Sequence, residues 1–192
     1  DVYKALEGMA YSLRNHPDSD LEAKCDEWID KFAAAQQSDG YINTFYTLTG
    51  LENRWDDMGK HEMYCAGHLI EAGIAYYKAR GKDKLLTVGR RMADHMMTLF
   101  GPDKQHWVAG HEEIELALVK LYEVTGEKKY LDEAKFFLDY RGKTEISDIY
   151  SQSHQPVVEQ TEAWGHAVRA GYMYAGMADV AALTGDEGYI KA

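Results

Sequence analysis

His61-Glu62-Met63-Tyr64-Cys65-Ala66-Gly67-His68 leads directly into an apolar run over 69–80 that predicts a long helix. The Gly-His pair recurs at Gly110-His111 and Gly165-His166, where a long loop gives way to another apolar helix. Each of these helices ends at a turn of one kind: Arg80-Gly81-Lys82-Asp83, Thr125-Gly126-Glu127-Lys128 and Thr184-Gly185-Asp186-Glu187. The chain is therefore predicted to repeat one unit of long loop, helix, tight turn and helix.

Length and charge limit the class of protein. The chain has 192 residues, of which 45% are hydrophobic, enough for one domain (1–192) with a substantial core. Its formal net charge is −11, which argues against nucleic acid or an anionic membrane surface as a partner. Cys25 and Cys65 are too few for a disulfide framework.

The apolar stretches indicate whether the protein spans a membrane, and the two ends indicate whether the sequence is part of a longer chain. The most apolar segment, 170–183, contains Asp179 and is too short for a membrane span. We expect a soluble protein, with cytoplasm and periplasm both open as its compartment. Because a helical pattern begins at Asp1 and another is under way at Ala192, we also expect a piece of a longer protein, truncated at both ends.

The helices differ in character from one to the next. The helix expected over 111–124 is apolar nearly all round, whereas that over 129–141 has one apolar and one charged face. Such alternation predicts an inner ring of helices covered by an outer ring, which is an all-α fold of the α/α toroid type. We expect a partial (α/α)6 barrel of about seven helices in successive hairpins, over 2–14, 21–37, 61–80, 84–100, 111–124, 129–141 and 158–183.

Histidines are the main candidates for chemistry. His61, His111 and His166 occupy equivalent places in three repeats, so we predict that they converge on the rim formed by the long loops. Near helix N-termini their imidazoles should stay neutral and suit hydrogen bonds to hydroxyls. His61, Cys65 and His68 could also present an N, S, N set to zinc on one helix face. The alternative, which we favour, is that both histidines satisfy backbone groups around a buried Cys65, and we predict no metal site here.

Acidic residues lie beside two of these histidines. Glu112, Glu113 and Glu115 follow His111, and we interpret them as helix-capping or solvated groups. In a helix over 158–183, Glu162 would stand four positions before His166 and could pair with it. The chain has no phosphate-binding glycine loop, no Gly-x-Ser-x-Gly elbow and no Cys-x-x-Cys motif.

Four motifs together carry a family resemblance: Asp39-Gly40-Tyr41-Ile42-Asn43-Thr44, His61-Glu62-Met63-Tyr64-Cys65-Ala66-Gly67-His68, Gly110-His111-Glu112-Glu113-Ile114-Glu115 and Glu159-Gln160-Thr161-Glu162-Ala163-Trp164-Gly165-His166-Ala167-Val168-Arg169. In order and spacing they resemble glycoside hydrolase family 127, the β-L-arabinofuranosidases. The resemblance implies an (α/α)6 barrel that removes terminal L-arabinofuranose, or a related sugar, from plant-type glycans with retention. It also implies a zinc-bound cysteine nucleophile and a glutamate acid/base.

The resemblance assigns roles to residues of this chain. It implies that His61, His111 and His166 contact the terminal sugar, and the other substrate-binding candidates in the motifs are Tyr41, Asn43, Glu62 and Gln160. No catalytic residue and no metal ligand is expected within this segment. Zinc is expected in the full-length protein through downstream Cys and Glu ligands. The expected partner is a carbohydrate, with a homodimer as a further possibility.

Two other classes of protein stay open at this point. Other α/α toroids, such as epimerases of N-acyl hexosamines and unsaturated glucuronyl hydrolases, would share the architecture. A helical-repeat scaffold would bind a protein on its concave face and would need no catalytic machinery. Because a scaffold has no need of histidines and aromatics confined to one rim, that confinement favours a carbohydrate enzyme.

Overall fold

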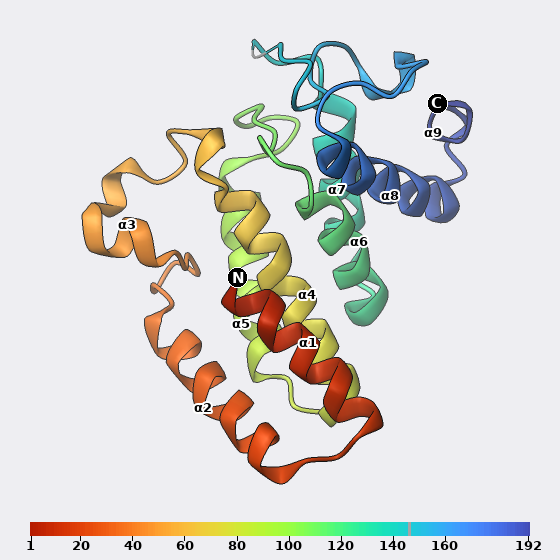
Figure 1. Cartoon of the computed structure of the whole chain (residues 1–192). Coiled ribbons are helices and arrows are strands. Elements are labelled where there is room, and N and C mark those ends of the chain that lie inside the picture. The colour runs from red at the N-terminus through yellow and green to blue at the C-terminus, as the bar shows by residue number, and fades with distance from the viewer. Residues whose placement is uncertain (146) are drawn as a thin grey trace.

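The computed structural model describes residues 1–145 and 147–192, which form nine α-helices and no strand, with one isolated bridge between Phe100 and Gln105 (Figure 1). The α-helices are α1 (Val2–Asn15), α2 (Ser19–Ala35), α3 (Thr44–Thr49), α4 (Glu62–Arg80), α5 (Lys84–Leu99), α6 (Ile114–Thr125), α7 (Lys128–Tyr140), α8 (Ala167–Thr184) and α9 (Glu187–Lys191). Three 3-10 helices are η1 (Leu51–Asn53), η2 (Met58–Lys60) and η3 (Val157–Glu159). The all-α prediction is confirmed. None of the described helices is long and apolar enough to cross a bilayer.

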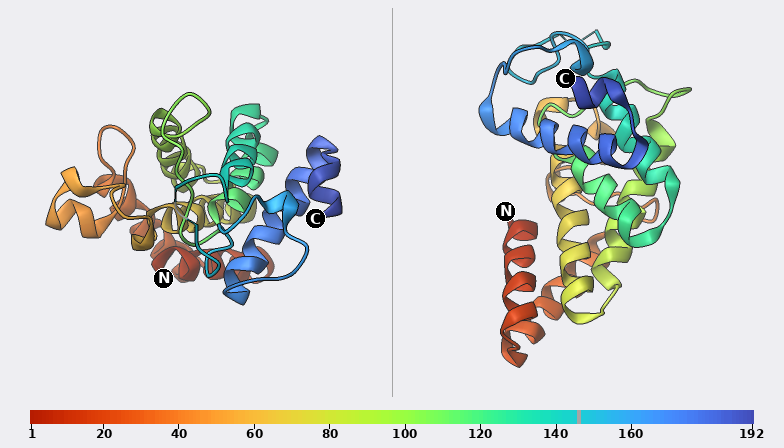
Figure 2. Two further views of the ribbon diagram at one scale, coloured as in Figure 1. Left: turned by 90° about the horizontal axis from the view of Figure 1, so that it is seen from above. Right: turned by 90° about the vertical axis from the view of Figure 1, so that its right-hand side faces the viewer.

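The long helices form two curved layers. In the inner layer α1 packs against α4, α4 against α6, and α6 against α8, while α5 and α7 cover α4 and α6 from outside (Figure 2). The burial of each helix matches its place in the layers. In the inner helix α4, every residue over 66–76 is buried. In α7, by contrast, buried apolar residues alternate with charged ones that are exposed or half-buried, apart from buried Glu133.

Glycine ends each of the inner helices α4, α6 and α8. Gly81, Gly126 and Gly185 have φ values of 71°, 72° and 71°, in the left-handed region that side chains disfavour. Each donates its N–H to the carbonyl four residues earlier. The chain then reverses into an outer helix, so the predicted hairpins are confirmed.

Two inner helices begin later than the sequence pattern suggests. The helix expected from 111 begins at Ile114, and the one expected from 158 begins at Ala167. Gly165 explains the second difference, since its φ of +73° is incompatible with a helix and a Cβ there would lie 2.1 Å from the Ile149 carbonyl oxygen. The predicted pairing of Glu162 with His166 assumed that both residues lie in one helix. That assumption was wrong, because α8 begins only at Ala167.

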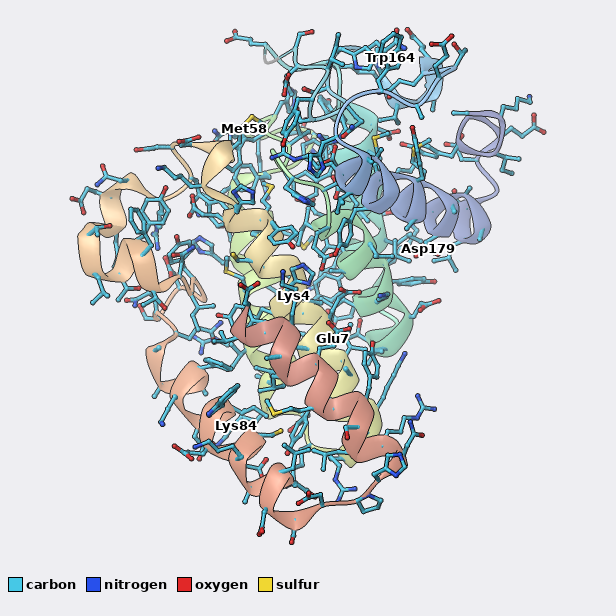
Figure 3. All side chains as sticks on the ribbon, in the orientation of Figure 1. Lys4, Glu7, Met58, Lys84, Trp164 and Asp179 are labelled. Atoms are coloured by element: carbon cyan, nitrogen blue, oxygen red, sulfur yellow. The ribbon has the colours of Figure 1, made fainter. Side chains whose placement is uncertain are left out.

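The long loops gather at one rim of the molecule. The segment expected to be a loop over 38–60 contains the short α3 and two 3-10 helices. Asn43 starts α3, because its side-chain oxygen accepts the N–H of Phe45 at 3.0 Å. The N-terminal ends of α4, α6 and α8 meet these loops, and Figure 3 shows Trp164 on the loop that leads into α8. This rim carries the candidate site.

Candidate functional site

The rings of three histidines stand in a row at the long-loop rim. The ring centroids of His61 and His111 lie 5.9 Å apart, and those of His111 and His166 lie 6.4 Å apart. These residues begin or precede α4, α6 and α8, three neighbouring helices of the inner layer. The predicted convergence of the three histidines is confirmed.

His61 is held by a strained backbone. It is the N-cap of α4 with φ 63° and ψ 26°, a left-handed conformation that is uncommon outside glycine. Its Nδ1 lies 2.6 Å from the carbonyl oxygen of Gly59. Strain of this kind persists only where the surrounding structure fixes the backbone, so the local structure also restricts the orientation of the His61 ring.

His111 and His166 are fixed by contacts between their two loops. His111 Nδ1 lies 2.7 Å from the carbonyl oxygen of Glu112. His166 is the N-cap of α8, and its Nδ1 accepts the backbone N–H of Arg169 at 3.4 Å. The guanidinium of Arg169 donates to the carbonyl of Gly110 at 2.5 Å. The start of α8 is thereby tied to the loop that carries His111.

In a neutral imidazole one ring nitrogen carries the proton, and the hydrogen-bond partner shows which one. A carbonyl only accepts, so Nδ1 of His61 and of His111 carries the proton and Nε2 is an acceptor. In His166 Nδ1 accepts, so Nε2 carries the proton and is a donor. Burial lowers the pKa of His111, the hydrogen bond to the Glu112 carbonyl opposes this, and nearby Arg169 acts in the same direction as burial. The row thus presents two acceptors and one donor.

Tyrosine rings surround the histidine row. The Tyr64 centroid lies 4.4 Å from His111, the Tyr172 centroid 5.5 Å from His111, and the Tyr150 centroid 5.1 Å from His166. The Tyr64 hydroxyl accepts a hydrogen bond from Lys4 at 3.1 Å. Apolar rings with a few convergent polar atoms are typical of a small-ligand site.

Tyr41 and Glu62, two further candidates, lie in the core and bind each other. The Tyr41 hydroxyl donates to Glu62 Oε1 at 2.5 Å, and Trp55 N donates to Glu62 Oε2 at 2.8 Å. Tyr41 is 0% and Glu62 2% exposed, and burial raises the pKa of Glu62. Their polar atoms are thus satisfied by protein partners, and a sugar contact for either stays a prediction.

Asn43 and Gln160 organise loops. Asn43 caps α3, as described above, while Gln160 is buried and its amide donates to the carbonyls of Gln152 at 2.8 Å and Gln155 at 3.0 Å. Both side chains therefore bond the backbone of the loop in which they lie. Their predicted contact with substrate stays a prediction.

Three carboxyl groups beside His111 are deeply buried. Glu112, Glu113 and Glu115 are each 0% exposed, so the interpretation of them as solvated groups was wrong. The capping interpretation is confirmed for Glu115, whose Oε2 accepts the backbone N–H of Glu113 at 3.2 Å at the start of α6. Arg141, also fully buried, has its guanidinium nitrogens 3.0 Å from Glu112 and 3.1 Å from Glu115. Burial raises the pKa of Glu112 to about 7, with the charge of Arg141 opposing this. Their place at the start of a helix that is apolar nearly all round was the signal of burial in the sequence.

Sequence and structure comparisons agree on the family to which this fold belongs. The family model described as the β-L-arabinofuranosidase GH127 catalytic domain matches residues 1–192. The chain belongs to this family. Membership separates it from the other α/α-toroid enzymes and from helical-repeat scaffolds, and it makes the two-layered helical array a part of the GH127 barrel.

Individual GH127 relatives are similar over nearly the whole chain. A non-reducing end β-L-arabinofuranosidase from Bifidobacterium longum subsp. longum is 42% identical over 220 residues, covering 99% of this chain and 33% of that protein. The crystal structure of a GH127 β-L-arabinofuranosidase from Geobacillus stearothermophilus T6 superposes with a TM-score of 0.95 at 44% identity, covering 98% of this chain and 33% of that one. A GH127 β-arabinofuranosidase structure superposes with a TM-score of 0.94 at 50% identity, covering 100% and 32%. The chain spans about a third of the length of these relatives.

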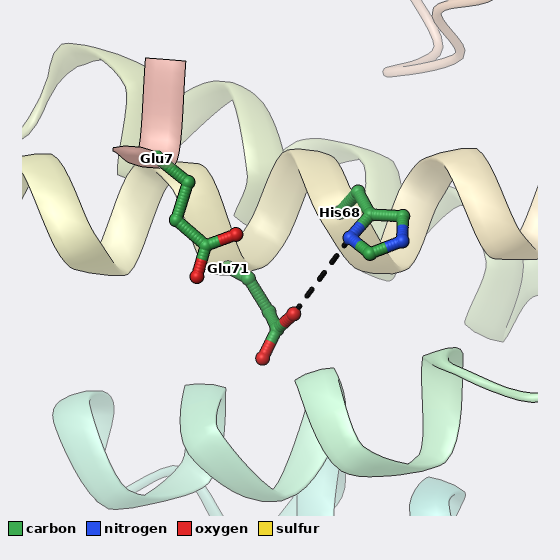
Figure 4. A group of neighbouring side chains, drawn as sticks. All are labelled: Glu7, His68 and Glu71. Carbon is green, nitrogen blue, oxygen red and sulfur yellow. Dashed lines mark ion pairs between the residues drawn. The ribbon is translucent and has the colours of Figure 1, made fainter. Parts of the chain in front are cut away.

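A cluster of two buried side chains and one half-buried side chain lies further along the inner face of this GH127 domain. Glu7 of α1 with His68 and Glu71 of α4 place one donor atom each within 4.8 Å of one another, and Figure 4 shows Glu71 between the other two. His68 Nδ1 also lies 3.3 Å from Glu113 Oε1, and burial lowers the pKa of His68 to about 4. Such a donor set could hold a cation. Lys120 already forms an ion pair with Glu71, so its ammonium group balances the negative charge of that carboxylate in place of a cation.

The two cysteines do not fit the zinc thiolate that the family resemblance implies. Cys25 lies on α2 and Cys65 on α4, neither is in a disulfide, and burial raises the pKa of both thiols. In the part of the chain that the structure describes, His61, Cys65 and His68 do not form a close ligand group, whereas the Glu7 cluster does. A zinc site with several cysteine ligands cannot be built from these residues, and we derive no catalytic step through zinc.

Proposed function

We propose that this chain supplies the part of a retaining β-L-arabinofuranosidase that binds the terminal sugar. The observation that carries the proposal is the row of His61, His111 and His166 at the long-loop rim of a GH127 domain. Terminal L-arabinofuranose, or a related sugar of plant-type glycans, is the proposed ligand. A homodimer, the other expected partner, is open to measurement by size-exclusion chromatography with light scattering.

The proton pattern of the row suits a sugar. A hydroxyl group both donates and accepts, so it pairs with the Nε2 acceptors of His61 and His111 and with the Nε2–H donor of His166. Burial lowers the pKa of His111, and a neutral ring there avoids the desolvation cost of a charge when the sugar displaces water. Tyr64 and Tyr172 add ring faces against which the apolar side of a sugar can pack.

The reacting groups are proposed to lie outside these residues. Retaining glycosidases hold a nucleophile and an acid/base about 5–5.5 Å apart on either side of the bond that breaks. Glu112, Glu113 and Glu115 are fully buried and cannot reach a sugar without rearrangement of the loop. The histidines would therefore position the sugar for groups that other parts of the whole protein contribute.

Activity measurements test the proposal. The whole protein is expected to hydrolyse an aryl β-L-arabinofuranoside, and His111→Ala or His166→Ala should raise its KM about 10-fold or more, the loss of roughly one hydrogen bond. His16→Ala, an exposed histidine in the turn between α1 and α2, is the matched control and should change nothing. The 192-residue chain alone should show no turnover. Turnover by that chain, abolished by Cys65→Ser, would place the nucleophile here and overturn the proposal.

A further inference from the structure

Arg141 joins two loops that are distant in the sequence. It follows α7 directly, is 0% exposed, and directs its guanidinium at both loops of the histidine rim. Nη2 donates to the carbonyl of Ala109 at 2.9 Å, and Nη1 donates to the carbonyl of Ser151 at 2.9 Å. One side chain therefore bonds both the loop that carries His111 and the loop that leads to His166, in addition to the contact of Arg169 with Gly110.

The contacts on the first loop bracket His111. Ala109 stands two residues before His111, and Glu112 stands directly after it. The Nη1 atom of Arg141 lies 3.0 Å from Glu112 Oε1, and the carbonyl of Glu112 is the group that holds the His111 ring. Any displacement of the guanidinium is thus transmitted to the backbone on both sides of His111.

On the second loop, the residue that follows Ser151 bonds directly to His166. Gln152, next to Ser151, donates through its amide to the carbonyls of Trp164 at 2.7 Å and His166 at 3.3 Å. His166 in turn donates its backbone N–H to the carbonyl of Tyr150 at 3.1 Å. Arg141, Ser151, Gln152 and His166 form a continuous chain of contacts.

Only arginine meets all of these groups at once. Its planar guanidinium carries five N–H donors in fixed directions on several nitrogens, whereas a lysine ammonium has three donors on one nitrogen and cannot reproduce this fork of contacts to two carbonyls and two carboxylates. The buried charge is offset by Glu112 and by Glu115, whose Oε1 accepts from Arg141 at 3.1 Å. Loss of the fork would leave buried carbonyls and carboxylates unsatisfied.

We propose that Arg141 is a positioning residue, which sets the spacing of His111 and His166 and through them the shape of the sugar site. It touches no substrate itself. The role in sugar binding rests on the proposed function, whereas the role in placing the two rings stands on the contacts alone.

Ring NMR of the histidines tests the placement without any substrate. In Arg141→Lys the ring signals of both His111 and His166 should shift relative to the unchanged chain, while those of exposed His16 should stay in place. Gln152→Met removes only the amide that holds the second loop and should shift the His166 signals more than those of His111, whose ring lies 6.4 Å away. If Arg141→Lys fails to fold, the Gln152→Met pattern still decides, and unchanged His166 signals in that variant would overturn the proposal.

Kinetics of the whole protein test the consequence for the site. Arg141→Lys should raise KM for an aryl β-L-arabinofuranoside about 10-fold with kcat changed less than about 3-fold, since misplaced binding groups weaken binding. Leu138→Ala, a buried residue of the same helix that touches neither loop carbonyl through a polar atom, is the control and should lower Tm but not raise KM. An equal rise of KM in both variants would overturn the proposal. Shifted ring signals in a whole protein without any activity on β-L-arabinofuranosides would refute the proposed function and support the placement role.

Discussion

His61 and His111 face each other with ring centroids 5.9 Å apart, and the ring of Tyr64 lies 5.7 Å from the first and 4.4 Å from the second. Tyr64 comes one helical turn after His61, on the same face of α4. The Tyr64 ring thus contacts the histidine at the start of α4 and the histidine in the loop before α6.

Tyr64 should matter through its ring rather than its hydroxyl. Tyr64→Phe keeps the ring and loses only the half-exposed hydrogen bond from Lys4, so KM of the whole protein should stay within about 2-fold. Tyr64→Leu removes the aromatic contact with His111 and should raise KM about 10-fold. Michaelis–Menten kinetics on an aryl β-L-arabinofuranoside measure both. Equal effects of the two substitutions would show that the hydroxyl is the important group.

Gly73 allows α4 and α5 to pack closely. A Cβ at Gly73 would lie 2.9 Å from Leu86 Cα, a backbone atom that cannot move aside alone. Gly73→Ala should therefore lower the free energy of unfolding by about 1–3 kcal/mol. Gly8→Ala is the matched control, because a Cβ on that exposed face of α1 meets nothing within 4 Å, and it should stabilise by about 0.5–1 kcal/mol. Urea unfolding followed by circular dichroism gives both values, and equal signs would contradict the packing argument.

Glu133 should make stability depend on pH. Burial raises the pKa of Glu133 to about 7, with Lys104 opposing, against the ordinary 4.5. Between these values the folded state holds a proton that the unfolded state has released, so stability falls as pH rises from about 4.5 to about 7. Glu133→Gln should flatten this part of the Tm-versus-pH curve. Glu159→Gln, at an exposed carboxylate of η3, should leave the slope as it is. An unchanged slope in Glu133→Gln would refute the assignment.

Lys120 and Glu71 should be strongly coupled. Lys120→Met leaves the buried carboxylate of Glu71 without its ammonium and should cost about 2–3 kcal/mol, below the 3–5 kcal/mol of a fully buried pair because Lys120 is partly exposed. Adding Glu71→Leu removes the stranded charge and should restore most of that stability. A double-mutant cycle by urea unfolding measures the coupling. Additive losses would show that the two groups act independently.

Local sequence determined the helices and their order. Left-handed glycines at Gly81, Gly126 and Gly185 end the inner helices, and the apolar periodicity between them requires burial on one side or on all sides. The equivalent places of His61, His111 and His166 in successive units then sufficed to predict that they meet. These features are repeated at fixed positions along the chain, so each can be inferred from residues close by in the sequence.

Which polar groups are buried, and which partners they have, follows from contacts between segments that are distant in the sequence. Glu112, Glu113 and Glu115 have the composition of a solvated helix start, yet packing of α6 against its neighbours excludes water from all three. Their partners are His68, which lies in α4, and Arg141, which directly follows α7. The start of α8 was likewise set by the approach of Gly165 to the distant Ile149 carbonyl. The cost of burying a charge depends on which groups surround it in space, and that is fixed only when distant segments pack together.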